Sequence, residues 1–167
     1  MNWNNFVNLK IFHMQLCVPQ YNIIEKDLEG MGGVLKRKFR VSLPEDECVI
    51  KLQKYCKFSS ILLKVPIISK SLCIDANCHN NVNQYVNTYG GGKISGYYLI
   101  TDIDNEKYGC AIYHSIWKNT YDKIIDITPF EDGRKYNIFS ILDTPEYYSG
   151  VVYNGNDYTI LSSGFKL

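Results

Sequence analysis

The sequence contains no long hydrophobic run, and none of its apolar stretches approaches the roughly 20 residues that a membrane-spanning helix needs. Its opening stretch, MNWNNFVNLKIF, lacks the charged start and the apolar core of a signal peptide. A dominant charge is also missing, since 18 Lys and Arg residues against 17 Asp and Glu residues give a net charge of +1. We therefore expect neither a nucleic-acid nor a membrane partner, because both attract strongly basic surfaces.

Cysteine is present, but it lacks the spacing of a disulfide framework or a zinc motif. The six cysteines are scattered, and no C-x-x-C pair occurs among them. Without a signal sequence, this pattern favours reduced thiols and a cytoplasmic protein. We interpret Cys48 and Cys56 as small core residues on one helix face. The same default, a side chain without chemistry, applies to Cys17, Cys73, Cys110 and His13.

No repeat, low-complexity segment or linker divides the chain, and 46% hydrophobic with 21% charged residues is typical of a globular protein. We predict a single domain over residues 1–167, with a mixed helical and strand half at 1–72. A helix and an antiparallel meander follow at 73–167. The fold class is α+β, with an antiparallel sheet packed on a helix. The basic segment LKRKFR at 35–40 is interpreted as the solvated face of a strand or turn.

Local patterns place the elements. Helices are predicted at 21–33, at 44–58 and from Cys78 to Tyr89, the last with Asn77 as N-cap and the glycines at 90–92 as its end. The segment 59–69 resembles a strand that Pro66 confines to an edge or a bend. Further strands are predicted at 94–102, 109–117, 123–129, 135–142 and 150–163, the last as a hairpin with a two-residue Asn154-Gly155 turn.

The adjacent Cys78 and His79 stand where the third helix begins, so Cys78 is open to interpretation as a nucleophile, a metal ligand or a buried thiol. The first turn of a helix offers free N–H groups and the positive end of its dipole, which lower the pKa of a thiol below about 8.5. The same N–H groups, those of Cys78 and His79, are placed to stabilise an oxyanion.

His114 and Asp126 lie on two strands that a short hairpin joins. We expect a three-residue loop at 119–121, which pairs Lys118 with Asp122 and sets His114 directly opposite Asp126 on the same face. A carboxylate in that position fixes the tautomer of the ring and stabilises its protonated form. We therefore expect a histidine held in this way to act as a general base for the Cys78 thiol.

The order of a helix-borne cysteine followed by His and Asp on successive strands resembles the papain-like cysteine hydrolases, and most closely their compact NlpC/P60 branch. The chain also resembles a group of proteins from bacteria and large DNA viruses that shares four motifs: Cys-His-x-Asn-Val, Gly-Gly, His-x-x-Trp and Asp-x-Thr-Pro. These motifs fall on Cys78, His79, Asn81, Val82, Gly91, Gly92, His114, Trp117, Asp126, Thr128 and Pro129. The resemblance covers about residues 75–130 and includes no clear oxyanion-hole glutamine before the cysteine.

The resemblance implies a papain-like fold and, as the substrate, an amide bond in a peptide, a protein or a small molecule. We therefore predict a cysteine hydrolase or acyl transferase in which Cys78 is the nucleophile, His114 the general base and acid, and Asp126 the orienting carboxylate. No cofactor is expected. Binding roles are predicted for His79, Asn81 and Trp117, although Asn81 also suits the orientation of a loop or a solvated position in the first turn, and Trp117 the core or its rim.

Two alternatives use the same residues. One is a non-catalytic binding module. The other is a zinc protein with Cys78, His79, His114 and Asp126 as ligands. Adjacent residues of a helix project about 100° apart, so Cys78 and His79 share one metal ion only awkwardly.

Overall fold

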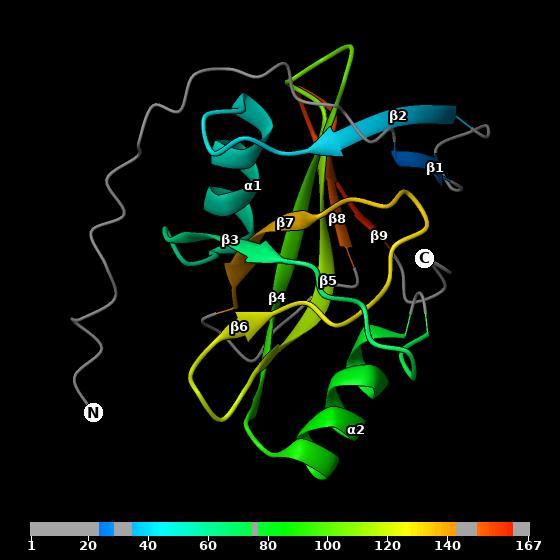
Figure 1. Cartoon of the computed structure of the whole chain (residues 1–167). Helices are drawn as coiled ribbons and strands as arrows, with labels where there is room; N and C mark the ends of the chain where they lie inside the picture. The colour runs from blue at the N-terminus through cyan, green and yellow to red at the C-terminus, as the bar shows by residue number, and fades with distance from the viewer. Residues whose placement is uncertain (1–23, 29–34, 75–76, 143–149, 162–167) are drawn as a thin grey trace, which may run out of the picture.

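The computed structural model describes residues 24–28, 35–74, 77–142 and 150–161, and it shows two helices and an antiparallel sheet (Figure 1). The helices are α1 (Glu47–Cys56) and α2 (Cys78–Tyr89). The strands are β1 (Ile24–Leu28), β2 (Leu35–Val41), β3 (Leu62–Pro66), β4 (Gly92–Asp102), β5 (Gly109–Lys118), β6 (Ile124–Ile125), β7 (Tyr136–Ile141), β8 (Gly150–Tyr153) and β9 (Tyr158–Leu161). The predicted α+β class is therefore correct.

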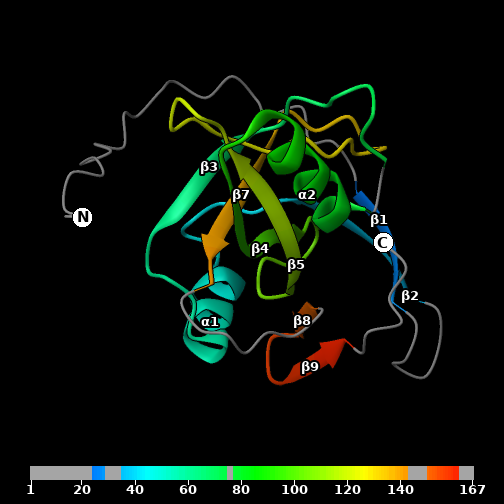
Figure 2. The same ribbon diagram turned by 90° about the horizontal axis from the view of Figure 1, so that it is seen from below.

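The long strands β4 and β5 pair with each other and form the centre of the sheet. The outer side of β4 is shared by β2 and β7, and β7 in turn pairs with β3, which carries Pro66 at its end. On the outer side of β5, β8 pairs with residues 109–112 and β6 with residues 117–118. The β5 segment between these two pairings carries His114, and α2 packs against β5 (Figure 2).

The two faces of β4 and β5 bury different side chains. One face packs Tyr98, Ile112 and Ile116 around Phe39 and Phe139. His114 lies between Ile112 and Ile116 on β5, two residues from each, so its side chain points to the same apolar face. The other face packs Tyr97, Leu99 and Ala111 against α1. A third cluster joins α2 to the end of β5 and consists of Val82, Trp117, Ile125 and Ile127.

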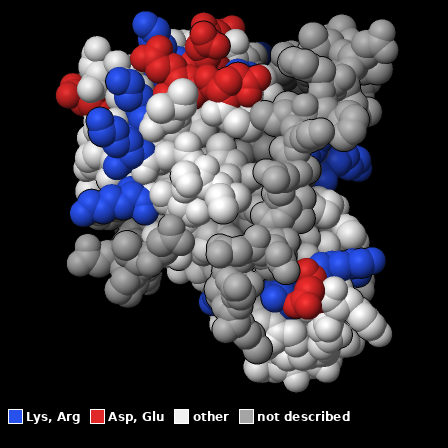
Figure 3. All heavy atoms as spheres, turned by 90° about the vertical axis from the view of Figure 1, so that its left-hand side faces the viewer, with Lys and Arg blue, Asp and Glu red and all other residues white. Residues whose placement is uncertain are grey.

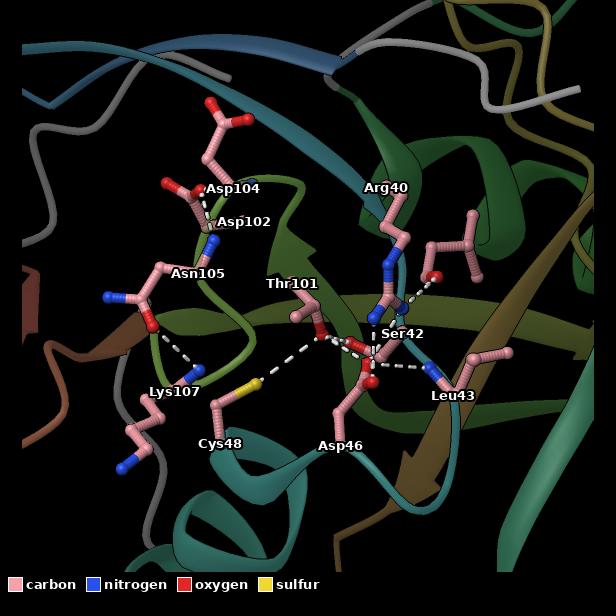
Figure 4. Close-up of polar contacts among 11 residues, drawn as sticks. Arg40, Ser42, Leu43, Asp46, Cys48, Thr101, Asp102, Asp104, Asn105 and Lys107 are labelled. Atoms are coloured by element: carbon pink, nitrogen blue, oxygen red, sulfur yellow. Dashed lines mark hydrogen bonds and ion pairs between the residues drawn. The ribbon is translucent and has the colours of Figure 1, made fainter. Parts of the chain in front are cut away.

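Helix α1 is anchored by its N-cap residue, Asp46, through the buried contacts drawn in Figure 4. Both carboxylate oxygens of Asp46 accept bonds of 2.7 Å from Arg40 on β2, and one of them also accepts a 2.6 Å bond from Thr101 on β4. Arg40 therefore departs from the predicted solvated face of 35–40. Cys48 is fully buried and Cys56 half-buried against the same core, in agreement with their expected packing role.

Three local predictions are wrong. The segment 24–28, expected within a helix, is strand β1, which pairs antiparallel with β2 along its whole length. The strand expected at 123–129 is limited to Ile124–Ile125. The last hairpin pairs Tyr153 with Tyr158, which gives a four-residue loop at 154–157 instead of a two-residue turn.

Surface charge is mixed on the face that Figure 3 shows: acidic side chains gather at its upper end, basic ones lie beside them and down one side, and a broad uncharged area lies in the middle. Within the described ranges, no helix is both long enough and apolar enough to cross a membrane.

Candidate active site

Cys78 is the first residue of α2, and its side chain is only 3% exposed. Asn77 occupies the N-cap position, as predicted, but its side chain makes no capping bond to the helix and instead accepts a 2.8 Å bond from Asn80. In any helix the first N–H groups have no carbonyl partner within the helix. The sulfur therefore stands at the positive end of the α2 dipole.

The far end of α2 is fixed by the predicted glycines. Gly90 and Gly91 have φ values of +74° and +87°, which favour glycine. A Cβ on Gly91 would lie 2.2 Å from the carbonyl oxygen of Lys118, so no side chain fits there. The Trp117 indole donates a 3.0 Å bond to the Gly90 carbonyl and packs beside Tyr85. These contacts tie α2 to the end of β5.

His114 and Asp126 are in contact, although the expected hairpin register is wrong. Trp117 pairs with Ile125 and Lys118 with Ile124, so the loop spans the five residues 119–123 and the register is displaced by two. A displacement by an even number keeps every side chain on its face. The Nε2 atom of His114 lies 2.7 Å from Oδ2 of Asp126, as a bond between the two side chains requires.

Asp126 is completely buried, and both of its carboxylate oxygens accept hydrogen bonds. Besides the His114 ring, Oδ2 accepts a 2.9 Å bond from Nδ2 of Asn137, and Oδ1 accepts a 3.0 Å bond from the Thr128 N–H. Its backbone N–H donates to the carbonyl of Pro66, the last residue of β3, and its carbonyl accepts from the N–H of Ile68, just beyond that strand. Such anchoring is needed because a carboxylate at zero exposure is unstable without several donors.

Burial and two imidazoles act on the Cys78 thiol in opposite directions. Burial disfavours the thiolate, but hydrogen bonds with His114 and His79 and the attraction of both rings outweigh it and lower the pKa of Cys78 from 9.0 to about 6. For His114, burial favours the neutral ring, but Asp126 and then Cys78 raise its pKa from 6.5 to about 10. A thiolate and an imidazolium therefore coexist between about pH 6 and about pH 10.

Three other cysteines provide a contrast. Burial raises the pKa of Cys48 to about 11 and that of Cys56 to about 12. Burial also raises the pKa of Cys73. Cys78 differs from these three in its two imidazole neighbours, which supply the charge that a buried thiolate needs. Cys17 and His13 lie outside the described residues.

His79, the residue after Cys78 in α2, is the second imidazole beside the thiol. Its Nδ1 atom is 2.6 Å from the Ser115 hydroxyl, which is itself 3.3 Å from the Ser95 hydroxyl. The ring packs on Tyr113 with a centroid distance of 4.7 Å. His114 and Ser115 are consecutive residues of β5, and their side chains point to opposite faces of the sheet. His114 carries one of the two imidazoles, and Ser115 binds the other, that of His79. Unlike His114, His79 is partly exposed, which leaves its predicted substrate contact open.

The structure places Asn81 and Trp117 in supporting positions. The buried Asn81 amide accepts from the Ile74 N–H at 3.1 Å and donates to the Ile74 carbonyl at 2.7 Å, so it holds the backbone of Ile74 in place. Its Nδ2 atom also reaches the Thr128 hydroxyl at 3.3 Å. These contacts correspond to the loop-supporting alternative for Asn81 and the core alternative for Trp117. The predicted binding roles of both residues stay predictions.

Sequence reasoning missed the role of two Asp126 neighbours, Thr128 and Asn137. No role was assigned to Thr128 from the sequence, whereas its N–H and hydroxyl join Asp126 to Asn81. A signal for Thr128 was present, because it belongs to the Asp-x-Thr-Pro motif. Asn137 carried no such signal, since it lies within an ordinary alternating strand segment and reaches Asp126 only through the pairing of β7 in the sheet.

Among the described residues, no three His, Cys, Asp or Glu side chains are arranged so that they could hold a metal ion together. The zinc hypothesis required four such ligands around Cys78. In the structure, Asp126 binds the Nε2 atom of His114, which leaves the other ring nitrogen for the contact with the Cys78 sulfur. The imidazole thus separates the carboxylate from the thiol.

Comparison with known proteins gives no further guide to the site. No protein-family model matches the chain, and neither a curated protein nor a solved structure matches it significantly. Membership of the papain-like hydrolases therefore stays a prediction, and the function has to be inferred from the contacts of Cys78, His114 and Asp126.

Proposed function

We propose that the protein is a cysteine-dependent hydrolase or acyl transferase that cleaves an amide bond with Cys78, His114 and Asp126 as its catalytic triad. One observation carries the proposal: the Cys78 thiol at the start of α2 contacts His114, whose Nε2 atom bonds Asp126 at 2.7 Å. The lowered pKa of Cys78 supports it, because the thiolate is the nucleophilic form. A papain-like arrangement of helix and sheet is part of the same proposal.

In the first half of the reaction, the Cys78 thiolate adds to the amide carbonyl carbon and a C–S bond forms. The resulting oxyanion is stabilised by the N–H groups at the start of α2, a role that a glutamine side chain performs in papain-like enzymes. When the C–N bond breaks, the His114 imidazolium gives its proton to the departing amine. The products of this half are a free amine, a thioester on Cys78 and a neutral His114 ring.

In the second half, His114 acts as a base. It takes a proton from water, whose oxygen adds to the thioester carbon, and the C–S bond breaks to release a carboxylic acid and the Cys78 thiolate. The imidazolium is restored beside Asp126. An amine in place of water gives a new amide, which is the acyl-transfer version of the same step.

The proposed substrate is an amide in a peptide, a protein or a small molecule. The test uses a pool of N-acetylated peptides that carry a C-terminal aminomethylcoumarin amide, together with intact-mass measurement of the protein after rapid acid quenching. We expect coumarin release and a mass increase on Cys78, both abolished in Cys78→Ala. Cys56→Ala, which removes a thiol of raised pKa in α1, is the matched control and retains both signals.

Retention of coumarin release by Cys78→Ala would remove Cys78 as the nucleophile. Absence of both signals, with iodoacetamide alkylating Cys78 no faster than Cys56, would instead support the non-catalytic binding module. Near-stoichiometric zinc that protects Cys78 from alkylation until a chelator is added would support the zinc protein.

A further inference from the structure

A chain of buried polar side chains continues behind Asp126, away from Cys78. Asn137 on β7 is 1% exposed, and its Nδ2 atom donates a 2.9 Å bond to the carboxylate oxygen that also binds His114. The Oδ1 atom of Asn137 accepts a 3.1 Å bond from Nη1 of the buried Arg134. The order is therefore His114, Asp126, Asn137, Arg134.

Arg134 is fixed on its other sides. Its Nε atom donates to both carboxylate oxygens of Asp132, at 3.0 and 2.8 Å. Its guanidinium also lies over the Phe130 ring at 4.4 Å. These residues belong to the connection from β6 to β7, which Figure 1 shows in yellow. A guanidinium held by a carboxylate and an aromatic face has little freedom to turn.

The fixed guanidinium decides which way the Asn137 amide points. A guanidinium carries only donors, so the amide oxygen must face Arg134 and the amide NH₂ must face Asp126. With the amide turned over, its oxygen would oppose the Asp126 carboxylate and its NH₂ would oppose the cation. Two unfavourable contacts would then replace two hydrogen bonds.

We propose that Arg134 and Asn137 are positioning residues for catalysis: Arg134 orients the Asn137 amide, and that amide holds Asp126 in place as the charged partner of His114. This inference rests on the proposed function of Cys78, His114 and Asp126. Neither Arg134 nor Asn137 contacts the thiol or the substrate in this scheme. Both act through Asp126.

The physical argument concerns the charge on Asp126. Three donors stabilise this buried carboxylate, namely the His114 ring, the Asn137 amide and the Thr128 N–H. Loss of the Asn137 donor makes the carboxylate charge more costly and favours transfer of the His114 proton to Asp126. The ring then becomes neutral, so it stabilises the Cys78 thiolate less well.

The experiment measures the rate of Cys78 alkylation by iodoacetamide from pH 5 to pH 11 in the full chain, with folding checked by circular dichroism. This profile reports the thiolate–imidazolium pair without any substrate. In Asn137→Ala we expect the midpoint at which the Cys78 thiolate forms to rise by about one pH unit, so that the alkylation rate at pH 6 falls about fivefold. Arg134→Gln should shift the midpoint in the same direction, and the double variant should match Asn137→Ala alone.

The matched control is Thr101→Val, which removes a buried hydrogen-bonded hydroxyl from β4 among the residues of Figure 4. It should lower the melting temperature without moving the profile. If Asn137→Ala does not fold, the alkylation profile of Arg134→Lys tests the proposal instead. This variant keeps the positive charge but loses the forked guanidinium that bonds both Asn137 and Asp132.

An unchanged profile in a folded Asn137→Ala or Arg134→Lys variant overturns the positioning role, and so does additivity in the double variant. A wild-type profile with a midpoint near 9 would instead remove the activated pair, and with it the proposed function. A wild-type midpoint near pH 6 without turnover of any amide counts against the proposed function alone. The positioning role of Arg134 and Asn137 is still measured by the alkylation profile in that case.

Discussion

The side chains of His114 and Asp126 meet at 2.7 Å although the two residues are not cross-strand partners. Extension of the register that pairs Trp117 with Ile125 would set Asp126 opposite Ile116, two positions from His114. Residues two apart share a face and lie close enough for a ring and a carboxylate to meet diagonally. The contact therefore depends on the parity of the hairpin and on the bonds that hold Asp126 beyond the end of β6.

Asp126→Asn tests this contact. An amide in place of the carboxylate stabilises the imidazolium poorly and can favour the wrong ring tautomer, so we expect turnover to fall by about 10³- to 10⁴-fold. The fold should persist, because Asn occupies nearly the same volume. Coumarin release and circular dichroism measure the two effects. Activity at the wild-type level would show that His114 needs no carboxylate at this position.

The alkylation rate of Cys78 should rise through about pH 6, where its thiolate forms beside the His114 imidazolium. Cys56, whose pKa burial raises to about 12, should react only at strongly alkaline pH. In His114→Ala the midpoint for Cys78 should move upward, because burial then acts with less opposition from imidazole. Site-resolved mass spectrometry of iodoacetamide-labelled peptides gives both profiles. Identical midpoints in wild type and variant would contradict activation by His114.

The free energy of unfolding should depend on pH differently in wild type and in Cys78→Ser. The raised pKa of His114 stabilises the fold below pH 6.5 and loses that contribution as pH rises through about 10. The lowered pKa of Cys78 stabilises above pH 9.0 and loses its contribution as pH falls through about 6. Between pH 6.5 and pH 9.0 the two slopes oppose each other, so the wild-type curve should be nearly flat.

Without the thiol, only the histidine slope remains. The stability of Cys78→Ser should therefore begin to fall above pH 6.5, by up to about 1.4 kcal/mol per pH unit. Urea unfolding at several pH values measures both curves. Parallel curves for the two proteins would show that the ion pair is not formed.

Gly91→Ala should destabilise the protein by about 1–3 kcal/mol or more. The position has φ +87°, and the new Cβ would lie 2.2 Å from the Lys118 carbonyl oxygen. Gly92→Ala is the matched control, since a Cβ on Gly92 meets nothing within 4 Å. Its melting temperature should stay close to that of the wild type. Equal melting temperatures for the two variants would contradict the tight junction between α2 and β5.

Protein purified without added metal should contain no stoichiometric zinc, because Asp126 binds His114 instead of sharing a metal ion with it. Elemental analysis measures the zinc content. About one zinc per chain, lost in both Cys78→Ala and His114→Ala, would make the site a metal centre.

Much of the site followed from local sequence patterns. Helix α2 was predicted from Cys78 to Tyr89 because an apolar stripe and a glycine stop are both local signals. The shared face of His114 and Asp126 was also predictable, because side chains alternate along strands and only the parity of the register matters. The length of the loop between them was not predictable. The loop is shaped by the N–H groups of Tyr121 and Lys123, which both donate to the side-chain oxygen of Asn119, and the sequence does not show how many residues such bonds enclose.

Other features were decided by contacts between distant parts of the chain. The segment 24–28 has a composition that suits a helix, but pairing with β2 makes it a strand, and pairing energy outweighs weak local preference. Asn137 reaches Asp126 because β7 pairs with β3, where Asn137 is opposite Val65, and Ile67 just beyond β3 forms a bridge with Asp126. Nothing near Asn137 in the sequence signals that neighbour. Hydrogen bonds depend on positions in space, so only the tertiary structure placed Arg134 and Asn137 behind the candidate triad.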